Sequence, residues 1–138
     1  MEYRVNIVNK LCKQYENCLY VSIHNNAAGN GKEWKNAQGW SVYVYRKASE
    51  KSRKLAEYLF DECKGLKTRK ETPSRKYWES GLYVCKNTNC PAVLTENFFQ
   101  DNKDDVKFLL SDEGKKKIID IHVNGIINYI KNELSWKF

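Results

Sequence analysis

Two residues with the chemistry of a hydrolytic site stand at the ends of predicted strands. His24 closes a run rich in β-branched and aromatic residues at 18–24, and Glu96 closes an apolar run at 91–96. Sites in open α/β sheets form at the carboxyl ends of the strands, so the two side chains share one edge if their strands run parallel. A histidine there can bind zinc, and a carboxylate beside it can accept a proton from a metal-bound water. Taken alone, a histidine at a strand end is more often a hydrogen-bonded structural residue, and a glutamate after an apolar strand is usually a surface residue.

The rest of the chain interleaves strands with helices. The Ala-Val-Leu run at 92–94 is apolar without alternation, which is typical of a parallel strand covered on both faces. We therefore expect an α/β domain with a mostly parallel, twisted sheet flanked by helices. The predicted elements are a helix at 3–16, strands at 18–24 and 40–45, a helix from the Ser49 N-cap to about Cys63, strands at 82–85 and 91–96, a short helix at 106–110, and a long helix from Ser111 to about Leu134, with loops at 25–31 and 66–79.

Length and composition favour one globular domain over residues 1–138. The chain is 41% hydrophobic and 30% charged, which suffices for a single core and argues against disorder. No apolar run approaches the roughly 20 residues that cross a bilayer, so no membrane span is predicted. The first residues lack the apolar segment of a secretory signal, so the sequence predicts no signal peptide.

The chain is basic, with 24 Lys and Arg against 17 Asp and Glu and a formal net charge of +7. Such a surface favours anionic partners, which include nucleic acid, anionic lipid and an acidic cell wall. Much of the charge lies at 47–76, where a solvated helix face followed by a loop is an equally good explanation. Nucleic-acid binding is disfavoured, because the aromatic residues lie in or beside predicted strands and are expected to pack in the core.

The five cysteines are predicted to be free, buried thiols. Neither the Cys12/Cys18 nor the Cys85/Cys90 pair has the C-x-x-C spacing of a zinc or redox motif, and five thiols cannot all pair within one chain. Free thiols suit folding in a reducing compartment. A cysteine hydrolase built from Cys85 or Cys90 with His24 is disfavoured, because neither cysteine lies in a segment that lowers a thiol pKa.

Three separated segments resemble the zinc-dependent N-acetylmuramoyl-L-alanine amidases of the Amidase_3 type. They are VSIHNNA at 21–27 with GWSVYV at 39–44, LYV at 82–84 with TNCPAVLTENFF at 88–99, and the closing helices with Asn102, Phe108-Leu109 and GIINY at 125–129. The resemblance covers nearly the whole chain, in the family's order and spacing. It implies a hydrolase that cleaves the amide between N-acetylmuramic acid and L-alanine of peptidoglycan.

The resemblance implies specific roles for four residues. His24 matches a zinc-binding histidine, and Glu96 matches the general base that later protonates the leaving amine. Asn26 and Ala27 are expected to line the substrate cleft beside the metal. The implied cofactor is Zn²⁺, the implied partner is peptidoglycan, and the implied place of action is the cell wall, extracellular or periplasmic, for an autolysin or an endolysin.

The sequence departs from the family pattern in its zinc ligands. The family's opening strand, with a Gly-His-Gly type motif, and the glutamate ligand that follows it have no counterpart here, so the catalytic domain is predicted to be incomplete and the isolated chain weakly active or inactive. Three acidic residues outside any motif, Glu16, Glu33 and Asp61, are the remaining candidate ligands, and the other histidine, His122, is predicted to be a packing or surface residue. An exposed sheet edge is predicted to promote self-association.

Two further interpretations remain open from the sequence. The chain fits a non-catalytic module that keeps the fold and binds anionic cell wall through its basic 47–76 segment. It also fits a truncated relic of the amidase. The effect of Glu96→Gln separates these interpretations. Wall binding that survives the substitution would favour the binding module, whereas a loss of activity with binding intact would favour the enzyme.

Overall fold

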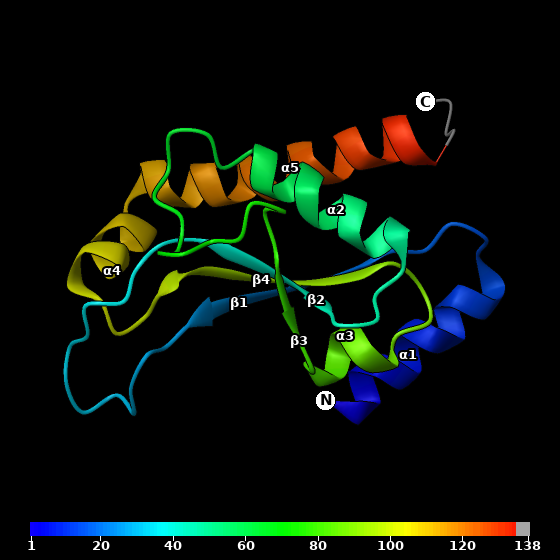
Figure 1. The fold of residues 1–138 in the computed structure, drawn as a ribbon, viewed down its shortest axis with the longest axis horizontal. Helices are drawn as coiled ribbons and strands as arrows, with labels where there is room; N and C mark the ends of the chain where they lie inside the picture. Colours follow the sequence, from blue (N-terminus) through cyan, green and yellow to red (C-terminus); the bar gives the residue numbers. More distant parts are fainter. Residues whose placement is uncertain (135–138) are drawn as a thin grey trace.

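Within residues 1–134, four strands form one sheet in the order β1-β4-β2-β3, and five helices flank it (Figure 1). The structure is a computed structural model that describes residues 1–134. Its elements are α1 (Glu2–Gln14), β1 (Tyr20–Asn26), β2 (Ser41–Tyr45), α2 (Glu50–Asp61), β3 (Trp78–Ser80), α3 (Tyr83–Asn87), β4 (Ala92–Phe99), α4 (Lys103–Leu110) and α5 (Asp112–Glu133).

The sheet is mostly parallel, as the sequence predicts. β1 pairs with β4 in parallel and β2 with β3 in parallel, whereas β2 and β4 run antiparallel. β1 is therefore an outer strand, and β4 is central between β1 and β2. This arrangement brings the carboxyl ends of β1 and β4 to the same edge.

Helices cover the two faces of the sheet unequally. α2, α4 and α5 lie over one face, where Val42, Val44 and Val93 pack with Leu55 and Leu59 of α2. α5 lies close against α2 at Gly125, where a Cβ atom would come within 2.9 Å of the Leu59 Cα. α1 and α3 lie on the other face, in a smaller cluster of Val5, Val84, Cys85 and Leu94. No helix within residues 1–134 combines the length and the apolarity that crossing a bilayer requires.

Side-chain caps fix where three of the helices begin. The Ser49 hydroxyl accepts the Ser52 N–H at 3.2 Å, and the Ser111 hydroxyl accepts the Gly114 N–H at 3.0 Å. Both caps agree with the sequence prediction. Asn102 caps α4 in the same way, which is why this helix starts at Lys103 rather than at the predicted residue 106.

The predicted strand at 82–85 is wrong. This segment forms the first turn of α3, which buries Val84 and Cys85 against the sheet. A short apolar run carries no periodicity that separates one helical turn from a buried strand. The third strand of the structure, Trp78–Ser80, overlaps the end of the segment predicted as a loop at 66–79, and its Trp78 ring stacks on Tyr43 of β2.

Candidate active site

His24 and Glu96 are direct neighbours across the β1–β4 pair. The two residues are register partners in this parallel ladder, and Ser41 of β2 is the partner of Glu96 on its other side. Register partners project from the same face of a sheet. His24, Glu96 and Ser41 therefore form a row across three strands, on the face that carries α1 and α3.

The Glu96 carboxyl is half-buried and incompletely paired. Its Oε2 atom is buried without a hydrogen-bond partner among residues 1–134, and so is the Ser41 hydroxyl beside it. Burial raises the pKa of Glu96, while the positive charge of Arg69 opposes that rise. A carboxyl with a raised pKa and a free oxygen is suited to exchange protons with a bound substrate.

The His24 ring is oriented by its own strand. Its Nε2 atom lies 2.9 Å from the Ser22 hydroxyl, two residues earlier on the same face. The His24 carbonyl oxygen accepts a hydrogen bond from the Asn97 side chain at 3.0 Å. The hydrogen bond to Ser22 leaves Nδ1 as the ring atom available to another partner.

Arg69 belongs to the candidate site and was not predicted from the sequence. Its backbone N–H donates to the Trp40 carbonyl at 2.9 Å, its guanidinium donates to the Tyr43 hydroxyl, and it lies 4.7 Å from the centre of the Trp78 ring. These contacts hold a positive charge near Glu96. Arg69 belongs to a basic run without a motif, so nothing local in the sequence separates it from its solvated neighbours.

A bulge at the end of β4 shapes the same edge. The β1–β4 register shifts between His24 and Asn26, and Phe98 has a φ of 64°, an unusual value for an aromatic residue. Asn97, which is buried, braces this irregular segment by accepting the Trp40 indole N–H at 2.8 Å and donating to the His24 carbonyl. Bulges of this kind re-aim side chains next to active sites.

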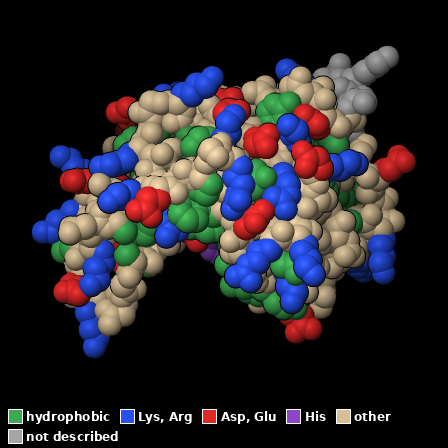
Figure 2. Space-filling model, in the orientation of Figure 1, with side chains coloured by type: hydrophobic (Ala, Val, Ile, Leu, Met, Phe, Trp, Pro, Cys, Tyr) green, Lys and Arg blue, Asp and Glu red, His purple; other side chains and the backbone are tan. Residues whose placement is uncertain are grey.

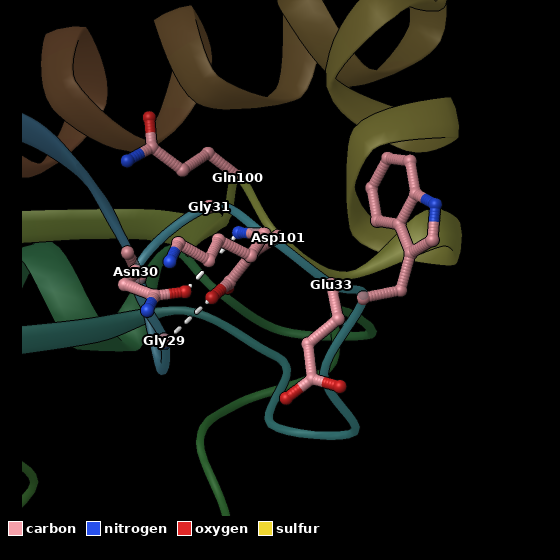
Figure 3. A pocket seen from close by; sticks show the side chains of 9 residues that line it. Gly29, Asn30, Gly31, Glu33, Gln100 and Asp101 are labelled. Atoms are coloured by element: carbon pink, nitrogen blue, oxygen red, sulfur yellow. Dashed lines mark hydrogen bonds between the residues drawn. The ribbon is translucent and has the colours of Figure 1, made fainter.

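A pocket of about 600 Å³ opens beyond the carboxyl ends of β1 and β4. Asp101 ties its two walls together, because its carboxylate accepts the Gly29 N–H at 2.8 Å and its carbonyl accepts the Lys35 N–H at 2.7 Å. Figure 3 shows Asp101 turned toward Gly29, while Glu33 and Gln100 point away from Asp101 on different sides.

The two predicted cleft residues, Asn26 and Ala27, differ in position. Ala27 lines this pocket, whereas the Asn26 side chain accepts the Ala27 N–H at 2.9 Å within the same turn. Ala27 follows His24 by three residues, and strands rise by about 3.3 Å per residue. The pocket therefore lies roughly 10 Å along the chain from the row of His24 and Glu96.

The surface around the site is hollowed and basic. Figure 2 shows a hollow between the loop that follows β1 and the end of the molecule that carries α3, with a histidine at its inner border. Lys and Arg side chains gather over α2 and β3, with acidic side chains among them. Several of these cations form ion pairs, namely Arg53 and Arg75 with Glu79, Lys54 with Glu57, and Lys76 with Asp61. Local pairing thus neutralises part of the 47–76 segment.

Residues 1–134 do not complete a catalytic zinc site around His24. They contain no cluster of three His, Cys, Asp or Glu side chains arranged to hold a metal ion, and such a site takes three protein ligands. Asp61, the last residue of α2, forms an ion pair with Lys76. Glu33 forms an ion pair with Lys35 in the loop after β1, and Glu16 lines a different pocket beside α1. None of the three candidate ligands joins His24.

His122 is a packing residue, as one of the two sequence interpretations holds. It is buried on α5, where Nε2 lies 2.9 Å from the Thr95 hydroxyl and Nδ1 lies 2.7 Å from the Ile118 carbonyl oxygen. Thr95 precedes Glu96 in β4, so its side chain projects from the opposite face of the sheet. His122 is therefore separated from His24 by the sheet, and burial lowers its pKa.

The structure does not support a cysteine nucleophile. Burial raises the pKa of both Cys85 and Cys90 to about 12, which keeps their thiols protonated near neutral pH. Cys85 belongs to α3, and its thiol lies 3.9 Å from the Tyr43 carbonyl oxygen. A catalytic cysteine needs the opposite environment.

Comparison with known proteins finds sequences and structures that are similar to this chain. The family model Amidase_3, described as N-acetylmuramoyl-L-alanine amidase, matches residues 1–128. The endolysin of Bacillus phage SPP1 is 35% identical over 116 residues, which are 78% of this chain and 38% of the endolysin. An uncharacterized cell wall amidase of Bacillus anthracis is 33% identical over 135 residues, which are 93% of this chain and 23% of that protein. The chain thus spans less than half the length of these relatives.

Solved structures share the fold. The N-acetylmuramoyl-L-alanine amidase of Clostridium difficile 630 superposes with a TM-score of 0.76 at 19% identity, over 96% of this chain and 66% of that one. The N-acetylmuramyl-L-alanine amidase of Mycobacterium smegmatis gives a TM-score of 0.77 at 19% identity, over 94% of this chain and 61% of that one.

Proposed function

This chain belongs to the Amidase_3 family of N-acetylmuramoyl-L-alanine amidases, and from that membership we propose that it hydrolyses peptidoglycan at the amide between N-acetylmuramic acid and L-alanine. The observation that carries the proposal is the half-buried Glu96 carboxyl, with a raised pKa and a free oxygen, next to His24 at the carboxyl edge of the sheet. The proposed place of action is the cell wall.

Glu96 is the proposed proton carrier of the reaction. In amide hydrolysis a base takes a proton from the attacking water, and the nitrogen of the leaving amine must receive one before the bond breaks. A carboxyl whose pKa is raised toward neutrality performs both steps. Arg69 places a fixed positive charge near the same atoms, where it stabilises the negative charge that develops on the amide oxygen.

The pocket beyond the ends of β1 and β4 is the proposed binding site for the part of the substrate that lies away from the scissile amide. It lies roughly three residues of strand away from the reacting row, the distance over which a sugar or a stem peptide extends. Trp34, half-exposed in its wall, offers an apolar ring, and Asn30 and Gln100 offer amide groups. Such a mixture of one aromatic and several polar side chains is typical of sites for polar ligands.

Product analysis tests the proposed reaction. Purified peptidoglycan incubated with the chain is expected to release peptides with a new N-terminal L-alanine, at a low rate, and Glu96→Gln is expected to lower that rate by about 10²-fold or more. Glu57→Gln, a glutamate of α2, serves as the matched control with an unchanged rate. Release that persists in Glu96→Gln, or that exposes another end group, would contradict the assignment.

Zinc binding by this chain is expected to be weak. His24 is a single ligand, and residues 1–134 supply no group of three candidate ligands around it. Calorimetric titration is therefore expected to give less than one zinc per chain at micromolar zinc, with the residual binding lost in His24→Ala and kept in the control His122→Asn. Tight binding of one zinc per chain that depends on His24 would show that further ligands complete the site.

A non-catalytic wall-binding module is the second candidate function. The incomplete set of metal ligands among residues 1–134 favours it, together with the basic side chains over α2 and β3. Sedimentation with insoluble peptidoglycan separates the two functions. Wall binding that survives Glu96→Gln, without any release of L-alanine termini by the unchanged chain, would favour the module.

We also propose that β1 mediates self-association. β1 is an outer strand, and its Ile23 is 60% exposed. Ile23 lines a pocket together with Ile119, which belongs to an exposed row on α5 with Val123 and Ile127. Two copies of an outer strand can pair across a twofold axis and bury such a row. Light scattering is expected to show a mass that rises with concentration, and Ile23→Lys is expected to abolish that rise. Ile7→Lys, on the exposed face of α1, should leave it unchanged.

A further inference from the structure

Four of the five cysteines line one pocket at the end of the molecule that lies away from Glu96. Cys12 of α1, Cys18 of the connection to β1, Cys85 of α3 and Cys90 before β4 all border a space of about 490 Å³. All four are free thiols. They come from segments up to 78 positions apart in the chain, since 90 − 12 = 78, and no role in the proposed hydrolysis uses them.

Hydrogen bonds seat α1 on the segment that carries Cys90. The Asn9 side chain donates to the Asn87 carbonyl at 2.9 Å and accepts the Asn89 N–H at 2.8 Å. Cys12 lies three residues after Asn9, on the same face of the helix. Cys12 is thereby turned toward the chain that leads from Asn89 into Cys90.

The Cys12 thiol lies close enough to two others to affect their titration. Burial, and after it the neighbouring Cys12, raises the pKa of Cys90. The same two causes, in the same order, raise the pKa of Cys18. Cys12 is therefore the central thiol of the three.

α1 is held to the domain by few contacts. Val5 is its one buried residue, while Tyr3, Ile7 and Leu11 of the same helix are exposed. A helix held by one buried side chain and one pair of amide hydrogen bonds opens easily. A covalent bond at its carboxyl-terminal end would change that behaviour more than any other single contact.

We propose that Cys12 and Cys90 are a redox-responsive pair, whose disulfide pins α1 to the segment before β4. The oxidant is a small-molecule disulfide. The thiolate of one cysteine attacks it and releases one small thiol, and the thiolate of the other then displaces the second. Two protein thiols are oxidised, one small disulfide is reduced to two thiols, and the protons of the protein thiols pass to the released thiols.

The pair is reduced inside a cell and becomes oxidised in the less reducing surroundings of the wall. Cys18 provides the internal alternative, because a Cys12–Cys18 bond would tie α1 only to its own connection. That bond would leave α1 free to leave the segment before β4. Only a Cys12–Cys90 disulfide would therefore fix α1 to the segment before β4.

Peptide mapping of the whole chain tests the proposal. After treatment with oxidised glutathione at mildly alkaline pH, a non-reducing digest is expected to contain a peptide pair linked through Cys12 and Cys90. Trypsin is expected to cleave α1 at Lys10 and Lys13 at least tenfold more slowly in the oxidised chain than in the reduced chain. A Cys12–Cys18 bond, glutathione adducts alone, or bonds between chains would overturn the proposal.

Two variants locate the effect on proteolysis. Cys90→Ser is expected to lose the protection, whereas Cys63→Ala, which removes a buried thiol next to α2, is expected to keep it. Equal protection in the oxidised Cys90→Ser chain would overturn the proposal. The map of the unchanged chain identifies the bond even if a variant folds poorly.

Discussion

Glu96→Gln is expected to stabilise the fold at neutral pH by about 1 kcal/mol, while it removes the proposed activity. The carboxyl of Glu96 is half-buried, and one of its oxygens has no hydrogen-bond partner among residues 1–134. Burial of an unpaired charged group costs folding free energy, and the neutral amide of glutamine avoids most of that cost. Partial contact of the side chain with solvent keeps the gain modest.

The gain should depend on pH in a definite direction. Burial raises the pKa of Glu96 in the folded state above its value in the unfolded chain. The folded state therefore binds the Glu96 proton more tightly than the unfolded chain does. This protonation contributes stability below the unfolded pKa of Glu96, and the contribution is lost as pH rises through the folded pKa. The difference between Glu96→Gln and the unchanged chain is expected to be near zero at acidic pH and to grow toward neutrality.

Glu79→Gln is the matched control, with the opposite sign. Its hydrogen bond to Arg53 and the nearby charge of Arg75 hold the pKa of Glu79 below its usual value. The ionised Glu79 carboxylate contributes stability above the pKa that Glu79 has in the unfolded chain, and this contribution is lost as pH falls through its folded pKa. Urea unfolding of both variants across pH separates the two cases. A loss of stability in Glu96→Gln at neutral pH would mean that this carboxylate is well paired.

Much of the fold is predictable because it rests on local signals. The Ser49 and Ser111 caps, the helical periodicity that follows them, and the apolar run at 92–94 each act within a few residues. The segments 78–80 and 82–85 lack such signals. Their structures depend on what each segment meets, since Trp78 pairs with Tyr43 and Val84 packs under the sheet.

The residues of the candidate site also differ in whether a local sequence signal predicts them. His24 and Glu96 are predicted from sequence, because each closes a predicted strand and the family motifs surround it, although the strands of the structure run on to Asn26 and Phe99. Arg69 is held at the site by contacts with Trp40 and Tyr43, which lie more than 20 residues before it in the chain. Asn97 follows Glu96 directly, but the Trp40 indole that braces it comes from 57 residues earlier. Such partners are set by tertiary packing, and a single sequence carries no record of them.

Asp105→Ala is expected to cost about 3 kcal/mol of folding free energy. The Asp105 carboxylate is buried and accepts two backbone N–H groups, from Gly39 at 2.8 Å and from Phe99 at 2.9 Å. Removing it leaves both donors buried without a partner, and charge-assisted hydrogen bonds are the strong ones. Urea unfolding measures the loss.

Asp104→Ala is the control, since Asp104 is exposed on the same first turn of α4 and has a similar place relative to the helix dipole. It is expected to cost less than about 1 kcal/mol. Comparable losses in the two variants would assign the effect to the helix terminus and not to the buried carboxylate.

The position of Asp105 explains why Asp105→Ala should also disturb the candidate active site. Gly39 has a φ of +98°, and a Cβ atom there would come within 2.5 Å of the Thr68 carbonyl carbon, so the start of β2 has no room to adjust. Phe99 ends β4 directly after the bulge that follows Glu96. One carboxylate thus holds together the ends of the two strands that carry Ser41 and Glu96. Any Asp105→Ala chain that still folds should lose hydrolysis with Glu96 intact.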